Sequence, residues 1–188
     1  MLAGCRIYVQ ATNGTSPLIQ GNLFDNGNTT IGTTFVTRIE NTGRCLKLAT
    51  FGIPIVAAPS QFAQNVVGFP VRCQLYQYDP TEQMLLGAAL ASAETEVQPG
   101  DVALRFRFVE PVQLDDATIY AILLTTGGDG IDFYDTYVTY TLYNGISSFA
   151  GGGFLSQEND DDDDSSMIEG TVLSFQTAVN LVSTLELA

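Results

Sequence analysis

Histidine and tryptophan are absent from this sequence, and lysine and arginine are scarce. Histidine is the side chain that most often exchanges protons near neutral pH, so a serine–histidine–aspartate triad and an imidazole metal site are excluded. Seven basic residues stand against 21 acidic ones, which gives a formal net charge of -14 at pH 7. Such a chain repels phosphate backbones, because nucleic-acid affinity comes from lysine and arginine displacing counterions. We therefore expect a protein that is not an enzyme and that binds neither nucleic acid nor an anionic membrane surface.

Long apolar runs are also missing. No stretch approaches the roughly 20 apolar residues of a membrane-spanning helix. Met1 is followed by Arg6 and a strand-like segment, so we expect neither membrane insertion nor ordinary export. The three cysteines allow at most one disulfide, and Cys73 shares a predicted inward face with its neighbours two residues away. We expect buried free thiols.

Two consecutive strand patterns are the strongest structural signal. Leu104, Phe106 and Phe108 alternate with Arg105 and Arg107, which is typical of a half-buried strand. The apolar run at residues 119–124 follows and predicts a strand that is buried on both faces. Further strands are expected at residues 6–10, 34–39, 44–51, 66–78, 136–143 and 171–179.

Two segments are expected to be mainly loop. Residues 82–94 contain apolar positions interrupted by Gly87, and we expect a loop with a short strand there. Residues 147–166 combine consecutive glycines with five aspartates at 160–164, which predicts a surface loop. About eight strands without alternating helices predict an all-β, antiparallel β-sandwich of jelly-roll type. Residues 1–33 are expected to form an N-terminal arm or loose hairpin, and residues 34–188 the sandwich domain.

A family resemblance rests on the order of several short features. These are Arg72-Cys73-Gln74-Leu75-Tyr76, Leu85-Leu86-Gly87, Pro111-Val112-x-Leu114 with Tyr120 six residues on, Tyr143 with Gly151-Gly152 and Ser156, the acidic loop, and Phe175. Over residues 34–178 the chain resembles the carbohydrate-binding-like β-sandwich domains of bacteriophage structural proteins and bacterial exported proteins. Two positions depart from the family pattern: Ala117 replaces the usual turn glycine, and Met167 stands near a common tryptophan.

Four tyrosines are the candidate binding residues. Tyr76, Tyr78, Tyr137 and Tyr143 fall on the outward faces of their expected strands. Exposed aromatic rings stack on sugars, and they also line contacts between protein subunits. Both uses stay open, although the absence of tryptophan argues against glycan recognition.

Asp129, Asp132 and Asp135 are the candidate metal ligands. They lie in a stretch from Gly127 that fits the calcium-binding pattern G-G-x-G-x-D-x-U-x. One copy of this repeat supplies half of a shared site, so the alternative is a glycine turn between two strands. Calcium takes six to eight oxygen ligands and is the ion that these carboxylates could hold. Asp132 and Asp135 would also suffice as the acid pair of a glycosidase, but nothing in the sequence places them in a cleft.

The functional expectation combines the resemblance with these absences. It is a phage virion surface protein, either a capsid decoration protein or a small tail or fibre component. Such a protein would be assembled in the host cytoplasm and would contact other virion proteins and copies of itself. The alternative is a carbohydrate-binding module that recognises a host surface glycan.

Overall fold

The described part of the chain is built from β-strands. The computed structural model describes residues 6–10, 18–23, 30–37, 46–57, 68, 70–98, 101–126, 138–144, 152–157, 174–176 and 179–187. Within these residues the strands are β1 Arg6–Gln10, β2 Leu18–Leu23, β3 Thr30–Val36, β4 Leu46–Ala57, β5 Pro70–Asp79, β6 Met84–Glu96, β7 Ala103–Leu114, β8 Ile119–Thr126, β9 Val138–Asn144, β10 Gly153–Gln157, β11 Ser174–Gln176, β12 Val179–Leu181 and β13 Ser183–Leu187. In this part of the chain, no helix is long and apolar enough to cross a membrane.

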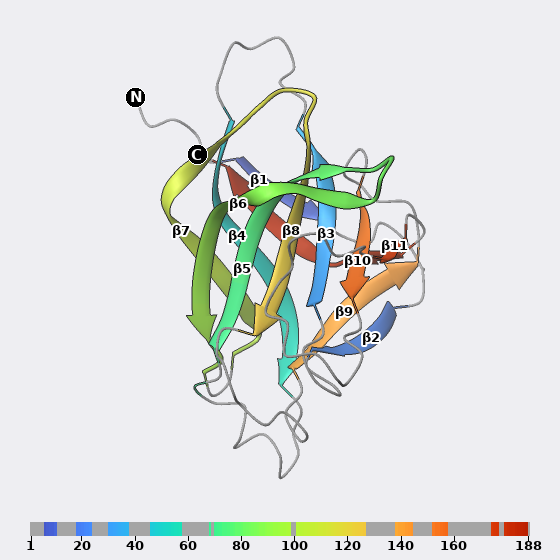
Figure 1. Cartoon of the computed structure of the whole chain (residues 1–188). Helices are drawn as coiled ribbons and strands as arrows, with labels where there is room; N and C mark the ends of the chain where they lie inside the picture. Colours follow the sequence, from blue (N-terminus) through green and yellow to red (C-terminus); the bar gives the residue numbers. More distant parts are fainter. Residues whose placement is uncertain are drawn as a thin grey trace.

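The strands form two sheets that pack face to face (Figure 1). One sheet has the order β1-β13-β4-β9-β12, with β7 paired to β4 and β2 paired to β9. The other has the order β11-β10-β3-β8-β5-β6. Each recorded strand pair is antiparallel. The predicted all-β, antiparallel sandwich is confirmed, with additional short strands beyond the expected eight.

Strand β8 lies in the middle of the six-stranded sheet, between β3 and β5. All five residues at 120–124 are fully buried. Tyr120, Ile122 and Leu124 point into the core between the sheets, whereas Ala121 and Leu123 belong to a second apolar cluster on the opposite face. The uninterrupted apolar run thus has the cause that the sequence predicts, because both of its faces are covered.

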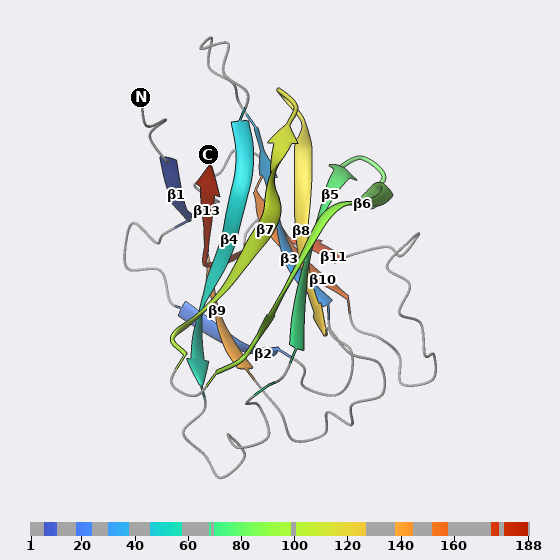
Figure 2. The same cartoon turned by 90° about the vertical axis from the view of Figure 1, so that its left-hand side faces the viewer.

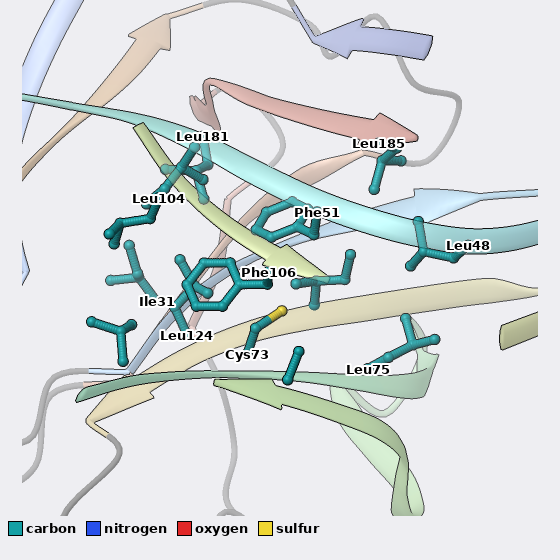
Figure 3. Packing of buried hydrophobic residues seen from close by; sticks show 14 of the residues in the cluster. Ile31, Leu48, Phe51, Cys73, Leu75, Leu104, Phe106, Leu124, Leu181 and Leu185 are labelled. Carbon is teal, nitrogen blue, oxygen red and sulfur yellow. The ribbon is translucent and has the colours of Figure 1, made fainter. Parts of the chain in front are cut away.

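The main core fills the space between the two sheets (Figure 3). Leu104, Phe106 and Phe108 all enter it, which confirms the inward face predicted for β7. The rings of Phe51 and Phe106 stack across β4 and β7 with centroids 6.4 Å apart. Cys73 is a free, fully buried cysteine, and burial raises the pKa of its thiol well above the usual value. The predicted buried thiol is confirmed there; Cys5 and Cys45 lie outside the described residues.

Two segments expected to be mainly loop contain strands. Strand β6 runs for 13 residues where a loop with a short strand was expected, and β10 lies within the expected surface loop. The first expectation was wrong, and the second was wrong for residues 153–157, for the same physical reason. The strands are stabilised by long-range partners, β5 for β6 and both β3 and β11 for β10, which local composition does not reveal. The aspartates at 160–164 lie outside the described residues.

The described segments of residues 1–33 pair with strands distant in sequence. Strand β1 pairs with β13, and β2 pairs with β9. The expected boundary after residue 33 falls inside β3, where Ile31, Thr33 and Thr34 are fully buried. These pairings place β1 and β2 in the seven-stranded sheet. The division into an arm and a domain stays a prediction.

Ala117 occupies the tight turn between β7 and β8 and has a positive φ of 53°. This left-handed conformation favours glycine. Hydrogen bonds hold the alanine there, because its N–H donates to the Thr37 carbonyl at 3.0 Å and to the Asp116 side chain at 2.9 Å. The turn therefore keeps this geometry without a glycine.

Gly32 allows β3 to approach β8 closely. A Cβ atom at this position would lie 2.2 Å from the Ile122 carbonyl oxygen and 2.7 Å from a methyl carbon of Leu123. We predict that Gly32→Ala lowers the free energy of unfolding by about 1–3 kcal/mol, because the backbone of β8 must move. Chemical denaturation followed by circular dichroism measures this change.

Gly52→Ala is the matched control, since Gly52 also lies in a buried strand. The nearest atom to its added Cβ would be 3.5 Å away, which is an ordinary contact. Its effect should stay well below that of Gly32→Ala. Equal losses for the two variants would show that close approach to β8 is not the cause.

Candidate interaction surface

Tyr76 and Tyr78 lie on the face of β5 opposite the main core, as their alternation predicts. They are nevertheless buried, with 7% and 3% of their surfaces exposed. They belong to the second apolar cluster, in which Leu85 of β6 and Phe175 of β11 pack beside them. The ring centroids of Tyr78 and Phe175 are 5.8 Å apart. The expected exposure of these two tyrosines was wrong, and neither ring is presented to a sugar.

The remaining candidate residues lie largely beyond the described structure. Tyr143 is placed by its backbone in β9, where it pairs with Leu18 and Asn180. Tyr137 and the three aspartates, Asp129, Asp132 and Asp135, lie outside the described residues. No group of three or more acidic or cysteine side chains suited to a metal occurs within the described ranges. The calcium site stays a prediction.

The large exposed hydrophobic side chains cluster in one part of the described chain, residues 84–109. Val109 is 97% exposed and Val102 78% exposed, and three residues of β6 are between 38% and 47% exposed. Those three are Met84, Leu86 and Leu90. We call β6, β7 and residues 97–102 that connect them the β6–β7 side.

The β6–β7 side is where both sheets end. Among the described strands, β6 pairs with β5 alone and β7 pairs with β4 alone. Residues 97–102 carry the chain from one sheet to the other, and a turn forms where the Gln98 N–H donates to the Asp101 carboxylate at 2.7 Å. Figure 2 faces this side and shows β6 running down to the connection and β7 running up from it, one in each layer. Each strand therefore presents one unpaired backbone edge.

A wide bulge interrupts β6. Residues 87–90 stand opposite the single residue Tyr76 of β5, and Gly87 has a positive φ of 69°. Leu90 lies in the bulge, while Met84 and Leu86 lie nearer the hairpin turn. The β5–β6 hairpin projects from the body of the sandwich in both views (Figures 1 and 2). On this hairpin Met84 and Leu86 are therefore partly exposed.

A similar bulge interrupts β7. Residues 108–111 stand opposite the single residue Ala49 of β4. Val109 projects from this bulge, and Pro111 offers no N–H to a neighbouring strand. Bulges and edge prolines discourage uncontrolled strand pairing. That function does not require exposed valine and leucine, so the apolar side chains call for a separate explanation.

Next to their connection, β6 and β7 carry side chains of opposite charge. Glu94 and Glu96 are exposed on β6, and Glu94 forms an ion pair with Arg72 of β5 at 3.4 Å. Arg105 and Arg107 are exposed on β7, with no carboxylate partner among the described residues. Glu110 is also exposed on β7, within its bulge. Next to the connection, β6 therefore carries acidic side chains and β7 carries basic ones.

Comparison with known proteins finds a similar fold among solved structures. No family model matches the chain, and no curated protein matches it. A solved structure of the cysteine protease and lectin-like domains of a surface layer associated protein of Clostridium difficile is similar, with a TM-score of 0.51 and 10% sequence identity. The match covers 94% of this chain and 37% of that chain. At this identity the likeness shows the fold alone.

Sequence reasoning missed the exposed hydrophobic residues. One signal for them is present: after Phe108 the alternation of β7 breaks, and Val109 stands where an outward polar residue would continue it. In β6, Gly87 among leucines and alanines marks the bulge. Neither signal identifies which apolar side chains remain uncovered.

Tyr78 and Tyr120 make a matched pair for testing how the β5 tyrosines are buried. The Tyr78 hydroxyl is buried and has no hydrogen-bond partner among the described residues, whereas the Tyr120 hydroxyl accepts the Asp115 N–H at 2.8 Å. We predict that Tyr78→Phe leaves stability unchanged or raises it by about 1 kcal/mol, because an unsatisfied polar group is removed. Tyr120→Phe should lower stability by about 1 kcal/mol. Denaturant midpoints of the two variants measure the difference.

Tyr78 also gives the stability of the protein a pH dependence. Burial, with a further contribution from Asp79, raises the pKa of Tyr78 above its usual value. The folded state therefore holds the phenol proton more tightly than the unfolded state does. This contribution to stability should be fully present below about pH 10 and lost as pH rises through the folded-state pKa. A Tyr78→Phe variant that loses stability over this range as steeply as the parent would contradict the assignment.

Proposed function

We propose that the chain is a structural protein of a virion surface that acts through protein–protein contacts and not through catalysis. Its role would be that of a capsid decoration protein or a small tail or fibre component. The observation that supports this is the clustering of exposed hydrophobic side chains on the β6–β7 side. Exposed apolar clusters of this kind mark interaction sites on soluble proteins.

The physical argument concerns the free energy of covering this surface. Val109 is almost entirely exposed, and burying such a side chain contributes about 1.5–3 kcal/mol. Leu86 and Leu90 are about half exposed, so burying the rest of each side chain would contribute a smaller free energy. A partner protein that covers all three gains apolar contact without any change in the core of the sandwich. The proposed partners are other virion proteins and copies of this chain, with assembly in the host cytoplasm.

Carbohydrate binding is the second candidate. The similar solved structure contains a lectin-like domain of a bacterial surface protein, which gives some support to a carbohydrate ligand. In this second candidate function, the ligand is a host surface glycan. The burial of Tyr76 and Tyr78 counts against it, because a sugar platform needs accessible rings. Tyr137, Tyr143 and the calcium candidate Asp129 remain available to this hypothesis.

The virion proposal predicts that the chain copurifies with virus particles. Particles from a culture that makes the protein are banded on a density gradient, and their proteins are quantified by peptide mass spectrometry. We expect a fixed number of copies per particle that is a multiple of a symmetry order. Detection of the chain only in the free-protein fractions would reject a virion role.

The contribution of the β6–β7 side is measured in the same preparation. A Leu90→Ser/Val109→Ser double variant should be depleted from particles at least about tenfold, because the apolar contact energy is lost. Gln113→Ser is the matched control, since Gln113 is exposed on β7 but polar, and its incorporation should be unchanged. The carbohydrate candidate would be favoured if neither the parent nor the double variant entered particles and both bound the same glycans on an array.

A further inference from the structure

The edges of β6 and β7 carry regular strand segments next to the connection between the sheets. Residues 91–96 of β6 pair in register with β5, and residues 103–107 of β7 pair in register with β4. Both bulges lie beyond these segments. In each segment, alternate N–H and C=O groups point away from the sheet and find no strand partner among the described residues. Each edge can therefore accept one more antiparallel strand.

The charges of the two segments lie on the outer faces of the sheets. Ala93 faces the main core, so Glu94 lies on the opposite face, where it meets Arg72. Leu104 and Phe106 likewise face the core, which places Arg105 on the outer face of the seven-stranded sheet. The acidic edge belongs to one sheet and the basic edge to the other.

We propose that a second copy of this chain docks on the β6–β7 side through a two-fold axis parallel to the strands. Such an axis places β6 of each copy beside β7 of the other. The pairs are antiparallel, because β6 and β7 run in opposite directions within one chain. The two sheets of one copy then continue into the two sheets of its partner. An interface of this kind is isologous and closes at two copies.

Charge complementarity supports this occupant. Rotation about a two-fold axis parallel to the strands leaves the position of each residue along the strand direction unchanged. Residues of β6 and β7 that are equally far from the connection therefore become neighbours across the interface. Glu94 precedes Val97 by three residues, and Arg105 follows Val102 by three. The carboxylate of one copy therefore meets the guanidinium of the other on the same face of the joined sheet. Opposite charges on neighbouring strands stabilise pairing, whereas like charges oppose it.

The apolar residues follow the same rule. Leu90 precedes Val97 by seven residues, and Val109 follows Val102 by seven. The β6 bulge of one copy thus lies beside the β7 bulge of the other, at a similar position along the strands. The first carries the exposed Leu90 and the second the exposed Val109. The same axis therefore covers the hydrophobic side chains that the isolated chain leaves exposed.

The inference rests on the proposed function only in requiring that the β6–β7 side makes protein contacts. It is tested on the purified chain without particles. Light scattering and sedimentation should show a concentration-dependent equilibrium between one and two copies. A monomer at every concentration up to the millimolar range would overturn the proposed dimer while leaving the particle experiment above to decide the virion role.

Charge reversal tests the symmetry itself. In Arg105→Glu/Arg107→Glu both edges become acidic, and in Glu94→Arg/Glu96→Arg both become basic. Each variant alone should dimerise at least about tenfold more weakly than the parent, because like charges face each other. Mixing the two variants should restore heterodimers to within about threefold of the parent affinity, since both contacts regain opposite charges.

Lys47→Glu is the control for net charge, because Lys47 is exposed on β4, within the sheet rather than at its edge. Its dimer affinity should match that of the parent, and thermal unfolding should confirm that all variants fold. Rescue on mixing, with Lys47→Glu unaffected, supports the proposal. A dimer that both reversals leave intact, or variants that do not rescue each other, would overturn it, because the contact would then lie elsewhere.

Discussion

Burial of β8 on both faces is the constraint from which the rest of the fold follows. Residues 120–124 are fully buried, with alternate side chains in the core and in the second cluster. One face requires the seven-stranded sheet as its cover. The other requires Tyr76, Tyr78, Leu155 and neighbouring apolar groups. The tyrosines that alternation directs outward are therefore part of a packed layer.

The exposed apolar surface lies at the edge strands β6 and β7, where the two sheets end. A sandwich whose centre is covered on both sides must still end its sheets somewhere, and here both end at β6 and β7. The bulges at residues 87–90 and 108–111 bend these last strands. They also carry Leu90 and Val109 out of the core. The features that terminate the sheets thus create the surface on which we propose contacts with other proteins.

Much of the fold could be predicted from local pattern. Strand β1 has the limits that the sequence predicts, and the apolar run of β8 and the alternation of β7 identify their faces correctly. Strand β10 escaped prediction because glycines and short length conceal it, and its pairing with β3 stabilises it. Alternation placed Tyr76 and Tyr78 on the right face, but it cannot tell whether another layer covers that face. The exposed side chains of the candidate surface escaped for the same reason.

Amide hydrogen exchange of the purified chain at low and high concentration tests the central claim most directly. The account predicts that residues 120–124 exchange slowest at both concentrations, since they open only with the whole fold. Residues 91–96 and 103–107 should exchange faster in the dilute chain and become protected as it associates. Rapid exchange in β8, or protection on association that avoids both edges, would contradict the account.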